Sequence, residues 1–381
     1  MLIVACMFFS FQTMAEKDTC RLRVSLLTIT PGAELYSVFG HSALRVVDST
    51  IGTDIVYNYG TFNFDDPDFY SKFVRGKLMY FLSQESFTNF MYEYQYFGRG
   101  VTEQVLDLTC EEKSKIQEFM FTNMEEGNRY YKYDFLKDNC TTRLRDIIFR
   151  KGQKDAIAPT PLLIGASTYR DHLHVYLDRA GMPWTKLGID LLLGMEADHQ
   201  MDASESMFLP DFLKSGLEGV KVSQRKLVGS ESILLKDMQP APVQPPFWAT
   251  PMFLFVLIML FYLSFATERM LKFSKMILVA DRVLFFVSGL LGCILAFMWY
   301  GTDHQSFGYN MDLVWAMPLN LPMAWVLGRK HVIPKTYLKA YSLLLLLLLF
   351  LIFLMPGNIN LALLPLVIAL SFRAWIRSKE I

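Results

Sequence analysis

The chain has 381 residues, of which 52% are hydrophobic, and its 37 basic side chains balance 37 acidic ones. This neutral charge argues against nucleic acid as a partner, because proteins that bind nucleic acid usually carry a basic patch. The hydrophobic residues are distributed unevenly. Residues 16–239 have the composition of a water-soluble domain, whereas apolar runs separated by short charged loops follow from Phe247 onward.

The first fifteen residues have the pattern of a signal peptide. Residues 2–11 are apolar, and Thr13-Met14-Ala15 is similar to a cleavage site. The basic residues that usually precede the apolar part are missing. We interpret residues 1–15 as a cleaved signal peptide, which predicts that the following domain is exported.

Strand patterns dominate the start of this domain, over residues 22–30, 42–48 and 54–59. His41 opens the second strand, and the small Ala43 shares its face because side chains alternate along a strand. Asn58 lies on the third strand. We therefore select His41 as a candidate base and Asn58, by its strand position, as the group that orients it.

Three cysteines lie in the domain outside the signal peptide and the apolar runs: Cys20, Cys110 and Cys140. Cys20 immediately precedes the first strand, and Cys110 immediately follows a strand-like segment that ends at Leu108. Two cysteines at the ends of neighbouring strands in an exported domain predict a disulfide between Cys20 and Cys110. Cys140 is then the odd cysteine, which indicates either a reactive thiol or an intermolecular link.

Aromatic residues are dense between positions 62 and 97, where thirteen of thirty-six residues are Phe or Tyr. The first interpretation is an aromatic hydrophobic core. The alternative is an apolar groove for acyl chains, which the neighbouring membrane segments favour.

Cys140 begins a predicted helix. Leu144, Ile147 and Ile148 have the spacing of one buried helical face, and Asp138 or Asn139 is suited to cap the helix. The free N–H groups and the dipole at a helix start favour negative charge. A thiol at this position is expected to have a lowered pKa and to act as a nucleophilic thiolate.

Two further histidines, His172 and His174, lie two residues apart. No cysteine or carboxylate stands near them at the spacing typical of metal ligands, so we interpret them as structural or surface residues. We expect no metal and no other cofactor.

Five apolar runs follow the proline-rich segment 240–246, which we interpret as a stiff linker. The runs cover residues 247–266, 282–300, 312–328, 338–355 and 361–376. Lys and Arg lie in the loops after the first and third runs and after the fifth, whereas the other two loops have none. The positive-inside rule predicts a multi-pass inner-membrane protein with residues 16–239 in the periplasm and residues 377–381 as a cytoplasmic tail.

Cys140, His41 and Asn58 together form a candidate catalytic group of nucleophile, base and orienting amide. A cysteine at a helix start and a histidine on a strand are typical of an α+β papain-like fold. The histidine precedes the cysteine, as in the circularly permuted NlpC/P60 branch. Backbone N–H groups beside Cys140, supported by Asn139 and Thr141, are candidates for an oxyanion hole.

Several motifs resemble the Lnb family, the lipoprotein N-acyltransferases of Bacteroides-type bacteria. In the exported domain they are Pro31-Gly32, Phe39-Gly40-His41-Ser42-Ala43, Tyr57-Asn58-Tyr59-Gly60-Thr61-Phe62 and Asp138-Asn139-Cys140-Thr141-Thr142. In the C-terminal part they are His304, Asn310 and Trp315-Ala316-Met317-Pro318-Leu319. The resemblance covers nearly the whole chain.

The resemblance implies transfer of a fatty acyl chain from a membrane phospholipid to the α-amine of a diacylglyceryl-cysteine on lipoproteins. It implies Cys140 as the nucleophile and His41 as the base. We interpret His304 chiefly as a polar residue at the membrane surface, and the alternative is that His304 and Asn310 bind substrate. Two other functions stay open, namely an exported cysteine peptidase or amidase acting on the cell wall and a non-enzymatic membrane scaffold.

Overall fold

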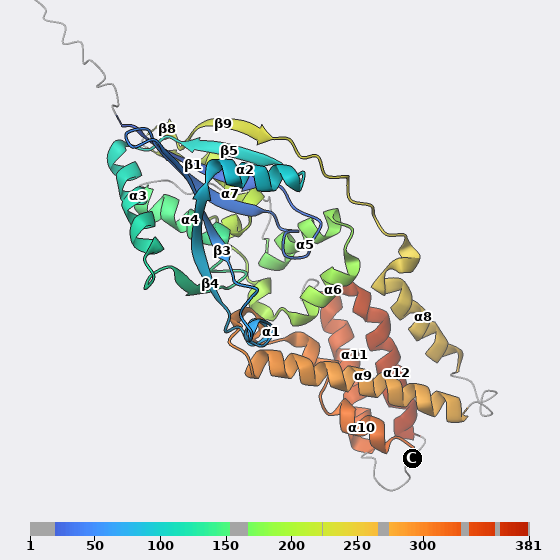
Figure 1. Ribbon diagram of the computed structural model, residues 1–381. Helices are drawn as coiled ribbons and strands as arrows, with labels where there is room; N and C mark the ends of the chain where they lie inside the picture. Colours follow the sequence, from blue (N-terminus) through green and yellow to red (C-terminus); the bar gives the residue numbers. More distant parts are fainter. Residues whose placement is uncertain are drawn as a thin grey trace, which may run out of the picture.

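The computed structural model describes residues 20–152, 167–222, 224–265, 274–328, 335–354 and 359–379. A domain built on one antiparallel sheet comes first, and a helical part follows it (Figure 1). The predicted fold class, an α+β domain followed by an all-helical membrane part, is confirmed in this two-part form. The signal peptide predicted over residues 1–15 lies outside the described residues.

The sheet has seven strands in the order β6-β4-β3-β2-β1-β5-β9, and all neighbours are antiparallel. The strands are β1 (Leu22–Ile29), β2 (His41–Asp48), β3 (Thr53–Thr61), β4 (Met79–Ser86), β5 (Val101–Leu106), β6 (Tyr130–Lys132) and β9 (Val228–Leu235). A separate short ribbon pairs β7 (Lys221–Val222) with β8 (Arg225–Lys226). The predictions for the first three strands are confirmed to within a few residues.

Helices cover both faces of the sheet. On one face pack α3 (Cys110–Met124), α4 (Cys140–Ile147) and α7 (Pro210–Gly219), and on the other packs α2 (Phe87–Tyr96). Alternate residues of β2 follow this division, since Leu44 belongs to the α4 side and Ala43 to the α2 side. Side chains that alternate along a strand are therefore buried on both faces, which explains the continuous runs of buried residues in β1 and β2.

A third cluster of apolar side chains lies under α5 (Tyr169–Arg179) and α6 (Pro183–Leu192). His172 is enclosed here and stacks on the ring of Phe212, with centroids 3.9 Å apart. His174 hydrogen-bonds to the carboxylate of Asp190 at 2.8 Å. Both histidines are structural, and the described residues contain no group of metal-ligating side chains.

A disulfide joins Cys20 to Cys110, whose Cα atoms are 5.3 Å apart. Cys110 is the first residue of α3, and Thr109 and Glu112 form a capping box at the start of this helix. The bridge fixes the start of β1 to the start of α3. Cys140 is a free thiol.

The helical part contains α8 (Pro251–Ser264), α9 (Ser274–Tyr300), α10 (Asn320–Val326), α11 (Lys335–Leu354) and α12 (Leu364–Lys379). Among the described residues, three segments are long and apolar enough to cross a membrane: Lys275–Tyr300, Lys335–Ile352 and Leu361–Lys379. The expected run 312–328 is not one continuous helix: a short 3-10 helix (Met311–Val314) is followed by α10, which begins at Asn320, after Pro318. Helix α12 also continues through Lys379, three residues beyond the expected end of the last run.

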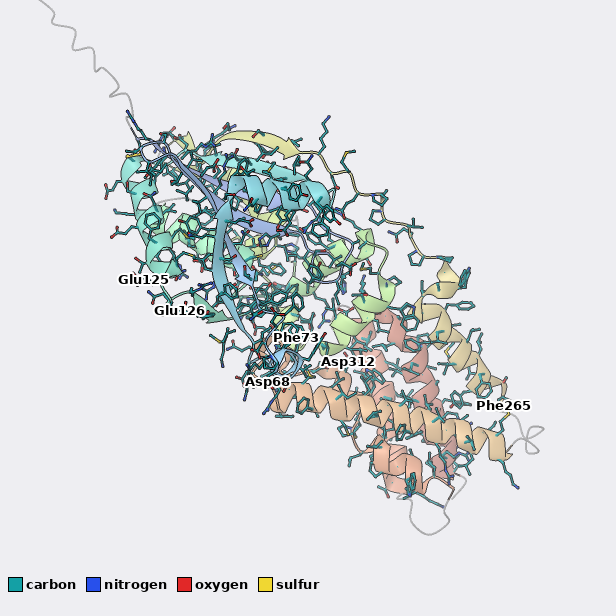
Figure 2. All side chains as sticks on the ribbon, viewed as in Figure 1. Asp68, Phe73, Glu125, Glu126, Phe265 and Asp312 are labelled. Atoms are coloured by element: carbon teal, nitrogen blue, oxygen red, sulfur yellow. A yellow bond between two sulfur atoms is a disulfide. The ribbon has the colours of Figure 1, made fainter. Side chains whose placement is uncertain are left out.

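The exported domain is docked directly on the helical part. The loop after α9 supplies Asp303, which pairs with Lys132 at 2.9 Å, and Ser306, whose hydroxyl donates to Asp134 at 3.2 Å. Asn360, just before α12, donates to Asp190 of α6 at 2.7 Å. Figure 2 labels Phe73 and Asp312 at this junction. The proline-rich linker reaches α8 in extended form, so it is a second connection beside these contacts.

Candidate functional site

Helix α4 begins at Cys140 because Asn139 caps it. The side-chain oxygen of Asn139 accepts hydrogen bonds from the backbone N–H groups of Thr141 and Thr142 at 2.8 and 2.9 Å. Its amide nitrogen donates to the carbonyl oxygens of Phe135 and Phe208. Asn139 therefore uses both its side-chain oxygen, as an acceptor, and its side-chain nitrogen, as a donor. It supports the site as a cap, and the structure gives it no free donor for the oxyanion contact that we expected.

A bulge in β3 makes room for the start of α4. The strand register shifts between Asn58 and Thr61, and Gly60 within this bulge has a φ of +89°, where a side chain would be strained. A Cβ built on Gly60 would lie 3.6 Å from the Cβ of Cys140. Glycine at this position therefore lets Cys140 lie directly against the end of the sheet.

His41, Asn58 and Glu85 form a hydrogen-bonded row across three neighbouring strands. The side-chain nitrogen of Asn58 donates to Glu85 Oε1 at 3.0 Å, so the amide oxygen of Asn58 faces His41. That oxygen lies 3.1 Å from His41 Nε2 and can only accept, so Nε2 carries a proton. The other ring nitrogen, Nδ1, is left for the sulfur of Cys140.

Cys140 and His41 shift each other's pKa. Burial by itself lowers the pKa of the His41 ring, but the charge and hydrogen bond of Cys140, with help from Asn58, raise it above its ordinary value. For the Cys140 thiol, burial raises the pKa, and the charge and hydrogen bond of His41 outweigh that effect and lower it. The balance favours a thiolate and an imidazolium, the form in which a cysteine is nucleophilic.

Two hydroxyl residues complete the surroundings of the sulfur. Thr141 Oγ1 lies 3.8 Å from Cys140 Sγ and 3.1 Å from the hydroxyl of Ser42. A hydrogen bond from Thr141 and another from the backbone N–H of Ser42 both help to lower the pKa of the thiol. Thr141 therefore lies beside the sulfur, and its expected part in an oxyanion hole stays a prediction.

His304 and Asn310 lie at the junction between the two parts of the chain. His304 Nε2 is 3.1 Å from the carbonyl oxygen of Phe73, and Asn310 donates to the carbonyl oxygen of Leu191 at 2.7 Å. Their polar side chains hydrogen-bond to the backbone of the domain built on the sheet. Both residues thus have docking contacts, and the alternative that they bind substrate stays a prediction.

Three residues of this site were not found in the sequence: Glu85, Ser42 and Gly60. Ser42 and Gly60 stand inside the quoted motifs, beside His41 and Asn58, and their position there was the available signal. Glu85 had no such signal, because it reaches Asn58 only through the pairing of β4 with β3.

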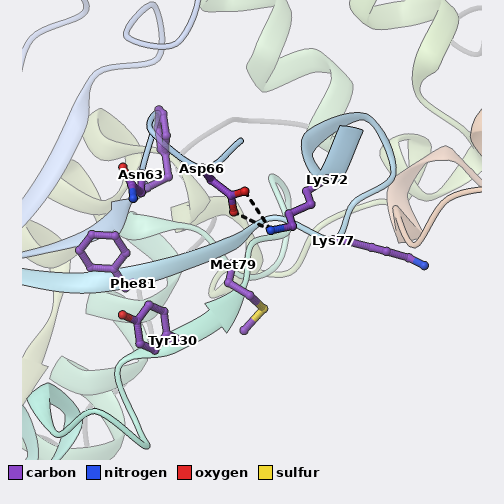
Figure 3. Close-up of a pocket in the computed structure, with 8 residues that line it drawn as sticks. Asn63, Asp66, Lys72, Lys77, Met79, Phe81 and Tyr130 are labelled. Carbon is purple, nitrogen blue, oxygen red and sulfur yellow. Dashed lines mark hydrogen bonds and ion pairs between the residues drawn. The ribbon is translucent and has the colours of Figure 1, made fainter. Parts of the chain in front are cut away.

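A cavity of about 420 Å³ lies near the site without including Cys140 (Figure 3). Its walls combine apolar and charged side chains: Phe62, Asn63, Asp66, Lys72, Lys77, Met79, Phe81 and Tyr130. Lys72 and Asp66 form an ion pair across it at 2.7 Å. Met79 and Phe81 flank Tyr80 on β4, so they point to the opposite side of the strand from it.

Two family models match the chain. The Lnb N-terminal periplasmic domain matches residues 12–178, and the Lnb transmembrane domain matches residues 243–379. No curated protein and no solved structure matches the chain. The expected relationship to papain-like and NlpC/P60 enzymes therefore stays a prediction.

The two family matches follow the same two-part order as the structure, and the first of them contains Cys140, His41 and Asn58. The chain is a membrane protein with a periplasmic domain, and it belongs to the Lnb family.

Proposed function

We propose that this protein is a lipoprotein N-acyltransferase. It moves a fatty acyl chain from a membrane phospholipid to Cys140 and then to the α-amine of a diacylglyceryl-cysteine on a lipoprotein. The observation that carries the proposal is the Cys140–His41 pair, in which each group shifts the pKa of the other toward the charged form. The same pair argues against a scaffold with an inert cysteine, since an isolated buried thiol has a raised pKa.

In the first step the Cys140 thiolate attacks the carbonyl carbon of the phospholipid ester. The carbon–oxygen bond to glycerol breaks, and the lysophospholipid hydroxyl leaves with the proton that His41 held on Nδ1. The products are a thioester on Cys140 and a neutral imidazole. Asn58 keeps the other proton on Nε2, so Nδ1 alone exchanges protons during the reaction.

In the second step the lipoprotein amine attacks the thioester. His41 accepts a proton from the amine as the amide bond forms, and the carbon–sulfur bond breaks to give back the Cys140 thiolate. Water competes with the amine for the thioester. A domain docked on membrane helices supports transfer over hydrolysis, because an apolar surface restricts the access of water.

The location in the inner membrane is part of the same proposal. The charges of the loops support an inner-membrane, multi-pass location with the periplasmic domain on the side of the lipoprotein substrates. The acceptor is then a diacylated lipoprotein that is held in the same bilayer as the donor.

The decisive experiment measures the intact mass of the full chain after incubation with phospholipid vesicles and without an acceptor. We expect an acyl adduct that hydroxylamine removes and that maps to Cys140. Cys140→Ala should give no adduct, and His41→Ala should form it about 10²- to 10⁴-fold more slowly, the usual contribution of a general base.

The matched cell experiment compares the masses of lipoproteins from cells that make the wild-type chain or Cys140→Ala. Lipoproteins with a third acyl chain in both strains would contradict the proposal. Release of free fatty acid from vesicles, together with cleavage of cell-wall peptides, would instead favour the hydrolase alternative.

A further inference from the structure

A series of aromatic rings connects Cys140 with the junction between the two parts of the chain. The first ring is Tyr133, whose edge would lie 3.8 Å from a Cβ on Gly60, beside Cys140. Successive ring centroids are 4.5 Å apart for Tyr133 and Tyr80, 5.3 Å for Tyr80 and Phe62, 5.7 Å for Phe62 and Phe69, and 6.1 Å for Phe69 and Phe73. The series ends on α1 (Phe69–Val74).

The rings differ in exposure in a way that suits a binding surface. Tyr133, Tyr80 and Phe62 are half-buried, so part of each ring is accessible, whereas Phe69 is only 9% exposed. At the far end Tyr70 is 80% exposed and Phe73 is 50% exposed. Large apolar side chains that gather in one exposed helix mark an interaction surface more often than chance exposure does.

The position of α1 indicates what meets this surface. The carbonyl oxygen of Phe73 accepts a hydrogen bond from His304, and the backbone N–H of Asp303 donates to the carbonyl of Arg75 at 2.9 Å. The loop with Asp303 and His304 directly follows α9, one of the helices long enough to cross a membrane. Helix α1 therefore lies at the end of a helix that is long and apolar enough to cross a membrane, and Figure 2 labels Phe73 there.

Charged side chains of both signs accompany the rings. Lys72 and Lys77 line the cavity of Figure 3 at the base of α1, and Lys72 is paired there with Asp66 at 2.7 Å. Aromatic rings beside a lysine such as Lys77 are typical of segments that lie in a membrane surface, where the rings enter the boundary of the acyl chains and an ammonium group meets phosphates. Helix α2 also has exposed aromatic residues, but it packs on the sheet.

We infer that α1 is a membrane-surface element and that the ring series binds one acyl chain of the donor phospholipid. Tyr70 and Phe73 enter the outer boundary of the bilayer. The chain then lies along Phe69, Phe62, Tyr80 and Tyr133, which brings its ester to Cys140. This inference rests on the proposed function for the reaction at Cys140, whereas the binding of the chain can be tested without any reaction.

The first test maps the bound acyl chain directly. The full-length Cys140→Ala variant is placed in vesicles that contain a phospholipid with a photoreactive diazirine in its acyl chain, and crosslinked peptides are identified by mass spectrometry. We expect adducts in residues 62–73 and 130–133 as well as in the membrane helices. Adducts in the membrane helices alone would overturn the inference. Because the variant cannot react, this result does not depend on the proposed function.

The second test separates the membrane step from the chemical step. The double variant Tyr70→Ser, Phe73→Ser is compared with the matched control Tyr92→Ser, Tyr96→Ser on α2, whose rings are 72% and 76% exposed. The measured quantity is the rate of Cys140 acylation from vesicles divided by the rate from a soluble short-chain ester. This ratio should fall about tenfold or more in the α1 variant, since both rings lose apolar burial, and stay at the wild-type value in the control.

Equal ratios in the two variants would overturn the inference. Crosslinking of residues 62–73 by a photoreactive diacylated lipoprotein and not by phospholipid would also overturn it, since the surface would then hold the acceptor. If the wild-type chain formed no adduct from either donor, the proposed function would fail, and the crosslinking map would still decide whether the rings hold an acyl chain.

Discussion

Two buried polar networks of this molecule differ in the group at which they end. In the membrane part, Asp281 of α9 is enclosed and receives hydrogen bonds from Arg373 at 2.7 and 2.8 Å and from Arg377 at 2.6 Å, both on α12. In the periplasmic domain, the row from Glu85 through Asn58 and His41 ends at Cys140, a half-buried free thiol. The first network closes on itself, whereas the second leaves a reactive atom at its end.

The difference shows why burial and charge alone do not identify a site. Both networks hold charged groups out of water, and in both the partners offset the cost of desolvation. In the closed network one carboxylate accepts hydrogen bonds from two guanidinium groups of another helix, so its role is to join two helices. In the open network the last group changes its protonation during a reaction. The variants below separate these two roles.

Breaking the closed network should have the largest effect on stability. Asp281→Ala leaves the buried guanidinium of Arg373 without its carboxylate, and breaking a buried ion pair in this way typically costs about 3–5 kcal/mol. We expect a much lower unfolding temperature in detergent and little folded protein in the membrane. Cys140→Ala should keep the wild-type unfolding temperature while it abolishes acylation.

A triple variant serves as the control for this prediction. Replacing Asp281 with Leu and both Arg373 and Arg377 with Met removes all three charges together, and a well-packed apolar replacement is often neutral. It should recover most of the stability that Asp281→Ala loses. A triple variant as unstable as the single one would show that packing and not the ion pairs holds α9 to α12.

The disulfide should give the next largest effect. Cys20 and Cys110 are separated by 90 residues, and removal of such a bridge typically costs about 2–5 kcal/mol. Cys20→Ser and the double variant Cys20→Ser, Cys110→Ser should lose equal stability, because one substitution already opens the bridge. Peptide mapping without reduction checks the pairing. A map that finds Cys140 in a bridge would remove its assignment as nucleophile.

The pH profile of Cys140 acylation tests the open network. The reactive form needs a thiolate and an imidazolium, so the rate should rise as pH passes the lowered pKa of Cys140 and fall as it passes the raised pKa of His41. Asn58 is one of the groups that raise the pKa of His41. Asn58→Ala should therefore move the alkaline limb to lower pH, with a smaller loss of rate than His41→Ala. An unchanged alkaline limb would contradict the orienting role of Asn58.

The residues of the open network that could be predicted are those with a local signal. Cys140 stands at a capped helix start, His41 opens a strand, and Asn58 lies on the following strand. Each of them could therefore be selected from a short segment of the sequence. Glu85 could not be predicted, because its contact depends on the register between β3 and β4 across a bulge. The order of the strands in the sheet likewise depends on contacts between distant segments.

Two features of the structure could not be read from composition. A polar loop beside a membrane has the same composition whether it binds a substrate or a neighbouring domain, so composition did not show that His304 and Asn310 contact the backbone of the periplasmic domain. Run 312–328 is mostly apolar, and composition did not show that α10 covers only Asn320–Val326, after Pro318.

A histidine outside both networks should give the smallest effect. Neither ring nitrogen of His172 has a hydrogen-bond partner among the described residues, and burial between aromatic rings lowers its pKa to about 4, with Asp171 offsetting only part of this shift. Between the ordinary pKa of 6.5 and about 4, the unfolded chain binds a proton that the folded chain does not. The contribution of His172 to the free energy of unfolding should therefore be complete above pH 6.5 and fall as the pH is lowered toward 4.

His172→Phe keeps the ring stacking and removes the proton site, so its unfolding temperature should decrease less than that of the wild type between pH 7.5 and pH 5. The exposed His199→Gln is the matched control, and it should follow the wild type. Equal acid sensitivity in His172→Phe and the wild type would show that other groups control the loss of stability, and the stacked ring would then be only a packing element.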